Sequence, residues 1–310
     1  MKGSENAGNG LDEMTRRFSE LAGPGSKTAM GVLLFRFAES RMPEGQRICY
    51  DPYAVHFINP DILEWAASHP EEARAMHEKR ERLLPGLGNS TVVRVRFFDD
   101  FVKRSMDEGF KQLVILGAGY DSRAYRMDGL KKMTIFEVDH PVTQAVKMKK
   151  IKEIFGSLPD HVVYVPTDRG KHGFGQRLLD KGYDRTRKTL FLMEGLSYYL
   201  LPEMVDEILS FITGNSGRGS CILFDYLPQS VVDGSCELEA ARNIRSHLAK
   251  LGEPLLFGIE EGTVETFLAK RGFFRVQNVT SEDYKKAYFQ GINEGRIVLG
   301  LLSFAHAVVE

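Results

Sequence analysis

Two glycines that follow an apolar run are the most informative feature of the sequence. Residues 113–116 read Leu-Val-Ile-Leu and lead directly into Gly117-Ala-Gly119. Glycine lets the backbone turn tightly and approach a ligand closely, which a nucleotide or nucleoside site at the carboxyl end of a strand requires. A plain strand-to-helix turn uses the same residues, so the motif alone leaves both interpretations open.

The next apolar run ends in a carboxylate. Residues 135–139 read Ile-Phe-Glu-Val-Asp, so Asp139 follows the glycines by about 20 residues, where a carboxylate can accept both hydroxyls of a ribose. Ser122 stands where the dinucleotide fingerprint has its third glycine, so close helix approach to a diphosphate is not provided. The pattern predicts a cofactor with a ribose and without the need for a diphosphate, which S-adenosylmethionine (SAM) satisfies.

Acidic residues follow further apolar runs. Asp121 lies in the first turn, Asp168 follows the third run and Glu194 follows the fourth. Because the carboxyl ends of parallel strands meet at one edge of a sheet, we expect these side chains and Asp139 to share a cleft. Helix capping would explain any one of them about equally well, but the regular placement of the set favours a ligand site.

The elements that position these residues follow from periodicity. Continuous apolar runs rich in Val, Ile and Phe are typical of strands covered on both faces, and they alternate with helical patterns. The fold class is therefore α/β, with a doubly wound, mostly parallel sheet. The strand pattern covers residues 112–116, 133–138, 162–166, 189–193, 220–224, 273–279 and 296–309. No helix is predicted before the last strand, and a strand reached in this way can pair antiparallel.

The chain also divides into regions. The helical pattern covers residues 28–40, 61–84, 89–106 and 260–270, and another helix is expected to begin at Pro202. We expect a flexible tail over residues 1–25, an N-terminal helical cap over 26–110, and a cofactor-binding domain over 111–310 with a lid insert at 227–258.

Charge and composition argue against several classes of partner. Lys and Arg total 41 and Asp and Glu total 42, so no net field favours nucleic acid or an anionic membrane. The apolar runs are shorter than the roughly 20 residues that span a bilayer, and the first residues lack the apolar core of a signal peptide. We therefore expect a cytoplasmic protein with no nucleic-acid or membrane partner.

Cysteine and histidine spacing bears on redox state and metals. The three cysteines are scattered and form no Cys-x-x-Cys unit, which suits a reducing compartment. The nearest approach to a zinc-protease motif begins at His77 and has Glu81 where the second histidine would stand. No metal site is predicted.

Several of these motifs, taken together, resemble the leucine carboxyl methyltransferases and their bacterial and archaeal relatives, which include carboxyl O-methyltransferases acting on polyketides. The matching segments are Ser26-Lys-Thr-Ala29, Arg94-Val-Arg-Phe-Phe-Asp99, Leu116-Gly-Ala-Gly-Tyr-Asp-Ser-Arg123, Phe136-Glu-Val-Asp-His-Pro141, Asp168 and Glu194-Gly-Leu-Ser-Tyr-Tyr-Leu200. They span residues 26–200 in the family's order. The resemblance implies the class I methyltransferase fold, a seven-stranded Rossmann-like sheet with an antiparallel last strand.

The resemblance also implies a role for individual residues around SAM. Lys27 and Arg94 would reach its methionine carboxylate. Gly117, in one turn with Gly119, would lie beneath it, and Asp139 would hold the ribose hydroxyls.

Further roles follow at the next strands. Asp168 and the backbone of Arg169 would meet the adenine, although relatives commonly have leucine at the position of Arg169. Glu194 would lie near the methionyl amine and the acceptor. Glu194, Arg94 and Tyr198 are the residues expected to act in the reaction.

The chemistry favours an oxygen acceptor. A carboxylate is ionised at neutral pH and needs no general base, whereas a hydroxyl needs one, and His140 is the only histidine in the matched motifs. We therefore expect esterification of a carboxylate on a small molecule or a peptide C-terminus, held by a cation such as Arg94 or Arg123. A nicotinamide-dependent oxidoreductase and a SAM-binding protein without transferase activity are the alternatives.

Overall fold

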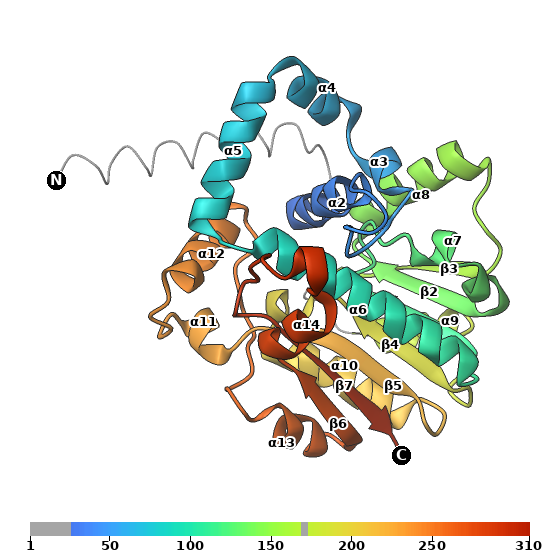
Figure 1. Ribbon diagram of the computed structural model, residues 1–310. Coiled ribbons are helices and arrows are strands. Elements are labelled where there is room, and N and C mark those ends of the chain that lie inside the picture. Colours follow the sequence, from blue (N-terminus) through green and yellow to red (C-terminus); the bar gives the residue numbers. More distant parts are fainter. Residues whose placement is uncertain (1–25, 169–172) are drawn as a thin grey trace.

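A single mixed sheet organises the chain in the computed structural model, which describes residues 26–168 and 173–310 (Figure 1). The strand order is β3-β2-β1-β4-β5-β7-β6, and all neighbours pair parallel except β7, which is antiparallel to β5 and β6. The strands are β1 (Gln112–Leu116), β2 (Thr134–Asp139), β3 (Val162–Pro166), β4 (Thr189–Met193), β5 (Cys221–Tyr226), β6 (Phe273–Val279) and β7 (Ser303–Val309). The predicted seven-stranded doubly wound fold is confirmed.

Helices cover both faces of this sheet, and the N-terminal helices α4 and α5 extend beyond it (Figure 1). The first group is α2 (Lys27–Ser40), α3 (Ala54–Phe57), α4 (Pro60–Ser68), α5 (Pro70–Leu83) and α6 (Leu87–Asp107). The crossover helices are α7 (Arg123–Arg126), α8 (Pro141–Phe155), α9 (Phe174–Asp180) and α10 (Pro202–Gly214). The last group is α11 (Gln229–Asp233), α12 (Glu239–Lys250), α13 (Val264–Ala269) and α14 (Ser281–Tyr288).

The continuous apolar character of the strands arises because each face of the sheet has its own core. Leu113 and Ile115 of β1 pack into the core that includes Phe98 of α6. The alternate residues Val114 and Leu116 pack into the core that includes α10. Since successive side chains of a strand point to opposite faces, burial on both faces requires apolar residues throughout.

One predicted helix is wrong in its extent. The pattern over residues 61–84 forms two helices, α4 and α5, separated at His69. Pro70 lacks a backbone N–H and disfavours helical geometry in the residue before it, so the helix ends at Ser68 and a second begins at Pro70. The break turns α5 away from the sheet, toward α12, where Asn243 Nδ2 donates to the Leu83 carbonyl over 2.9 Å.

The C-terminal prediction also needs correction. The strand expected over residues 296–309 is limited to β7, although it is antiparallel as expected. Helix α14 precedes it, and Thr280 and Asp283 form a capping box at its start. The helix expected over residues 260–270 is the shorter α13. In the described residues, no helix has the length and apolar character needed to cross a membrane.

Candidate functional site

A cavity of about 440 Å³ lies at the carboxyl ends of the central strands, beneath α2 and the start of α6. Most of the predicted site residues line it together: Lys27, Arg94, Gly117, Gly119, Asp139, Glu194 and Tyr198. Asp168 is not among the lining residues, and Arg169 lies outside the described residues. The volume falls in the range of roughly 300–1,000 Å³ that small-molecule and cofactor sites occupy.

The glycine turn after β1 forms the floor of the cavity. Gly117 and Gly119 have φ angles of 66° and 43°, a region that side chains rarely adopt. A Cβ atom on Gly117 would lie 3.1 Å from Leu196, which is tighter than ordinary packing. Glycine at position 117 therefore allows the backbone conformation and avoids a close contact with Leu196.

Asp139 is held against this turn from the end of β2. Its Oδ2 accepts a hydrogen bond from the Gly119 amide over 2.5 Å, and its Oδ1 accepts one from the His140 amide over 2.6 Å. Each carboxylate oxygen has a second lone pair, so both can still accept a hydroxyl donor from the cavity. Asp168 lies further along, with Oδ1 3.6 Å from Nε2 of His140.

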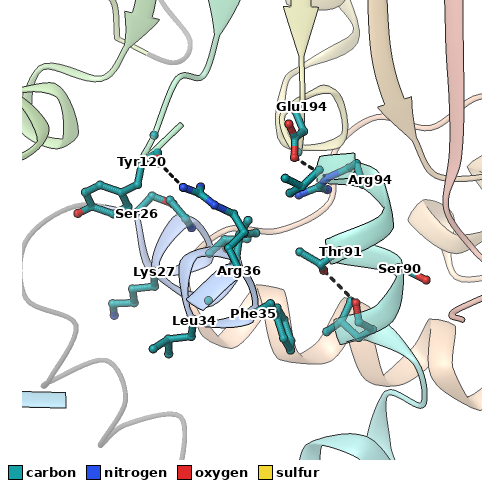
Figure 2. Close-up of a pocket in the computed structure, with 18 of the residues that line it drawn as sticks. Ser26, Lys27, Leu34, Phe35, Arg36, Ser90, Thr91, Arg94, Tyr120 and Glu194 are labelled. Atoms are coloured by element: carbon teal, nitrogen blue, oxygen red, sulfur yellow. Dashed lines mark hydrogen bonds and ion pairs between the residues drawn. The ribbon is translucent and has the colours of Figure 1, made fainter. Parts of the chain in front are cut away.

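Arg94 reaches into the cavity from α6 and is buried (Figure 2). Its Nε donates to Oε1 of Glu194 over 3.1 Å, and its Nη1 donates to Oδ2 of Asp225 over 2.8 Å and to the Tyr198 hydroxyl over 3.2 Å. Within the part of the chain that the structure describes, Nη2 of Arg94 has no hydrogen-bond partner. One edge of this guanidinium is therefore available to a ligand.

Burial and neighbouring charges shape the protonation of this group. Burial opposes charge on Arg94, but Asp225, Tyr198 and Glu194 raise its pKa well above the ordinary value. Burial raises the pKa of Asp225, and Arg94 opposes that shift. Burial, reinforced by Asp225, also raises the pKa of Tyr198, so its hydroxyl stays protonated at neutral pH.

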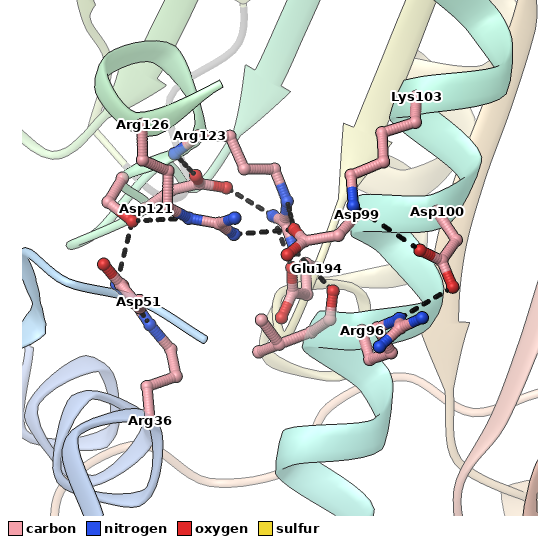
Figure 3. A network of polar contacts seen from close by, with 12 residues as sticks. Arg36, Asp51, Arg96, Asp99, Asp100, Lys103, Asp121, Arg123, Arg126 and Glu194 are labelled. Carbon is pink, nitrogen blue, oxygen red and sulfur yellow. Dashed lines mark hydrogen bonds and ion pairs between the residues drawn. The ribbon is translucent and has the colours of Figure 1, made fainter. Parts of the chain in front are cut away.

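The second oxygen of Glu194 belongs to a larger ionic network (Figure 3). Oε2 lies 2.7 Å from Nη1 of Arg123, and that guanidinium also pairs with Asp99 at 2.7 Å and Asp121 at 2.5 Å. The buried network consists of three arginines, Arg94, Arg123 and Arg126, and four carboxylates, Asp99, Asp121, Glu194 and Asp225. When all are ionised, it carries one net negative charge.

Contacts made by Arg36 and by Glu253 attach α2 and its N-cap to the cavity. Arg36 donates to the Tyr120 carbonyl over 2.9 Å and pairs with Asp51, which joins α2 to the glycine turn. Glu253 accepts hydrogen bonds from the Ser26 hydroxyl over 2.9 Å and from the Thr28 amide over 3.2 Å. Lys27 follows Ser26, and its side chain points away from Arg94 and Glu194 (Figure 2).

Sequence reasoning missed Asp225, the direct partner of Arg94. The predicted strand ended at residue 224, whereas β5 continues through Asp225 to Tyr226. An acidic residue at the carboxyl end of a strand is the same signal that identified Asp139 and Glu194, so it could have been found. Asp51 and Glu253 lie in loops that no strand or helix pattern marks.

Comparisons with known proteins point to a family of methyltransferases. The family model described as leucine carboxyl methyltransferase matches residues 29–213. The Bacillus subtilis protein named "Putative S-adenosyl-L-methionine-dependent methyltransferase YktD" is 27% identical over 82% of this chain and 82% of its own length. A Mycobacterium avium protein with the same general name is 29% identical over 89% of this chain and 93% of its own length.

Solved structures share the fold at low identity. A DUF574 family protein from Streptomyces avermitilis has a TM-score of 0.56 and is 13% identical, with 90% of this chain and 97% of that chain covered. The CurJ carbon methyltransferase has a TM-score of 0.50 and is 12% identical, with 100% of this chain and 71% of that chain covered.

Proposed function

We propose a specific reaction for this chain, which belongs to the leucine carboxyl methyltransferase family and is a SAM-dependent methyltransferase. In this proposal it transfers the methyl group of SAM to a carboxylate oxygen of a small molecule or a peptide C-terminus. The product is a methyl ester. The fit of the cavity to SAM supports the cofactor. The hydrogen bonding of the carboxylates that line the cavity supports the choice of acceptor.

The residues of the cavity fit SAM. Gly117 leaves room for close approach at the floor, and Asp139 has free lone pairs for the ribose hydroxyls. The free edge of Arg94 is proposed to bind the methionine carboxylate, and Glu194 to lie beside the methionyl amine. Lys27 also lines the cavity, but its side chain points away from Arg94, so it is given no part in holding that carboxylate. Asp168 and the backbone of Arg169 are proposed to reach the adenine, with SAM extending past the residues that line the cavity.

The charge of the site favours SAM over a nicotinamide dinucleotide. SAM carries a sulfonium and an ammonium group against one carboxylate, and the network beside the cavity carries one net negative charge. A diphosphate is usually bound at the N-terminus of a helix that follows the glycine turn. The helix here, α7, has only four residues and offers little dipole.

A single observation supports the choice of a carboxylate acceptor. The carboxylates that line the described cavity are Asp121, Asp139 and Glu194. Arginines pair with Asp121 and Glu194, and Asp139 is proposed to hold the ribose hydroxyls. Tyr198 stays protonated. A hydroxyl acceptor would need a general base at this end of the cavity, whereas an ionised carboxylate needs none.

The role of the chain is then mainly to orient its ligands. When bound, SAM supplies an electrophilic methyl carbon, whose bond to sulfur breaks as the bond to the acceptor oxygen forms, leaving S-adenosylhomocysteine. Arg94 is held by Glu194, Asp225 and Tyr198, so the free edge of its guanidinium has a fixed position. Fixed orientation of two reactants can supply effective molarities on the order of 10⁵ M or more.

The experiment uses methyl-labelled SAM with the full chain and a panel of carboxylic acids, phenols and amines. The proposal expects label in a product that mild base hydrolyses, with release of labelled methanol. Label in a base-stable ether or amine would contradict carboxylate methylation. Binding of SAM without turnover on any acceptor in the panel would instead favour a cofactor-binding protein that does not catalyse transfer.

A further inference from the structure

The cavity continues beyond the predicted SAM site into an apolar chamber between the N-terminal helices and α12. Its walls include Phe35, Trp65, Met76, Leu84, Ile244 and Leu248. They come from α2, α4, α5, the loop before α6, and α12. This part of the cavity suits the apolar body of an acceptor.

Phe35 and Arg94 lie at different levels along α6. Phe35 packs at the start of α6, since a Cβ atom on Gly88 would lie 3.0 Å from its ring. Arg94 lies six residues further along the same helix. At 1.5 Å per residue, the two backbone positions are about 9 Å apart along the helix axis, so the ring and the guanidinium belong to different ends of the cavity.

A cation lies beside the Phe35 ring. The guanidinium carbon of Arg80 lies 4.4 Å from the centroid of the Phe35 ring, and its Nη2 lies 2.7 Å from Nδ1 of His77. Its Nε is buried and has no hydrogen-bond partner. The side chain is 32% exposed and Glu81 is 3.9 Å away, so Arg80 lies at the rim of the chamber.

His247 of α12 lines the same chamber, and its Nδ1 is also buried without a hydrogen-bond partner. Burial lowers the pKa of Arg80, with Glu81 opposing the shift. Burial lowers the pKa of His247, and Lys250 and Arg80 add to that effect. Arg80 and His247 therefore both line this end of the cavity.

No carboxylate of the described lining residues lies at this end. Asp121, Asp139 and Glu194 all follow strands at the opposite end of the cavity. The Arg80 side chain is partly exposed and lines this end of the cavity, so a ligand oxygen can reach its guanidinium. A charged oxygen is favoured, because Arg80 is a permanent cation.

We infer that the acceptor carries two polar ends: the carboxylate that is methylated, and a second anionic group that binds the guanidinium of Arg80 beside Phe35. An apolar chain or ring system joins the two ends. This inference rests on the proposed function and specifies its substrate class. Arg80 acts in specificity, since it lies away from the reacting atoms.

The test measures binding rather than turnover. Trp65 is the only tryptophan of the chain and lines the chamber, so its fluorescence reports occupancy there. The protein, saturated with S-adenosylhomocysteine, is titrated with monomethyl suberate, which has a methyl ester at one end and a carboxylate at the other. Methyl octanoate has the same ester and a chain of the same length, but no carboxylate.

We expect monomethyl suberate to bind at least about tenfold more tightly than methyl octanoate. In Arg80→Gln the two ligands should bind within about threefold of each other, whereas Arg82→Gln, an exposed arginine of the same helix, should keep the preference. Circular dichroism melting of both variants checks that they are folded.

Equal affinities in the unmodified protein, or an unchanged preference in folded Arg80→Gln, would overturn the second anionic site. Neither result would contradict the proposed methyl transfer to a carboxylate. A failure of the protein to bind S-adenosylhomocysteine in the preceding saturation step would instead contradict the proposed function.

Discussion

Nη1 of Arg94 and Oδ2 of Asp225 lie 2.8 Å apart, and both side chains are buried. The pair joins α6 to the end of β5, which are 131 residues apart in the chain. Asp225 also accepts a hydrogen bond from the Gly195 amide over 2.6 Å, so it fixes the loop that carries Glu194. One ion pair thus positions the cation, the loop and the carboxylate on one side of the cavity.

Removal of the Arg94 side chain should lower the free energy of unfolding strongly. Arg94→Ala leaves Asp225 and part of Glu194 buried without a cation, and we expect the free energy of unfolding to fall by about 3–5 kcal/mol. Arg96→Ala, two residues along α6, removes a half-exposed pair with Asp100 and should cost less than about 1 kcal/mol. Urea unfolding followed by circular dichroism measures both. Equal losses would contradict the central position of Arg94.

The glycine turn can be tested with a matched pair of substitutions. Gly117→Ala and Gly109→Ala both place a side chain at positive φ, so each should lose about 1–2 kcal/mol of stability. Only the alanine at position 117 would meet a neighbour, because nothing lies within 4 Å of a Cβ at Gly109. Equilibrium dialysis with labelled S-adenosylhomocysteine should therefore show lost binding for Gly117→Ala alone. Equal binding by the two variants would contradict the role of Gly117 as the floor of the cofactor site.

Asp139 is predicted to determine cofactor affinity. Asp139→Ala removes both the proposed ribose acceptor and the brace on the Gly119 amide, and we expect the Kd for S-adenosylhomocysteine to rise by roughly 10–100-fold. Asp160→Ala, in an exposed turn before β3, is the control and should leave the Kd unchanged. Surface plasmon resonance on immobilised protein gives both values. An unaltered Kd in Asp139→Ala would show that Asp139 does not bind the ribose hydroxyls.

The pH dependence of stability should contain a contribution from Asp121. Burial opposes its ionisation, but Arg123 and Lys147 lower its pKa from 3.8 to about 2. A lowered folded pKa stabilises the protein fully above pH 3.8, and the contribution is lost as the pH falls toward about 2. It amounts to about 2 kcal/mol.

The variant Asp121→Asn isolates that contribution. The difference in unfolding free energy between the unmodified protein and this variant should be constant above about pH 5 and should shrink as the pH falls below 4. Guanidinium unfolding at a series of pH values measures it. A difference that stays constant down to pH 3 would show that the Asp121 pKa is not lowered by folding.

The sheet and most of the cavity could be predicted from the sequence, for a physical reason. Strands buried on both faces must be apolar throughout, and their carboxyl ends must meet at one edge, so Gly117, Asp139 and Glu194 were placed together from order alone. The break at Pro70 was also visible in the sequence, but helical spacing on both sides of it obscured the boundary.

Which side chains pair with one another across the fold could not be predicted from the sequence. Nothing in the local sequence specifies that Arg94 pairs with Asp225 or that Arg36 reaches the Tyr120 carbonyl, because both contacts depend on how distant elements pack. Arg123 is a sequence-predicted cation for the acceptor, and the structure surrounds it with Asp99, Asp121 and Glu194. Arg94, in contrast, keeps one nitrogen without a partner among the described residues.

Isothermal titration calorimetry tests most directly whether the cavity binds an adenosyl amino acid. The unmodified protein is titrated with S-adenosylhomocysteine and, in a separate experiment, with NADH. We predict saturable heat with one S-adenosylhomocysteine per chain and none with NADH. Heat with NADH alone, or with neither ligand, would contradict the account.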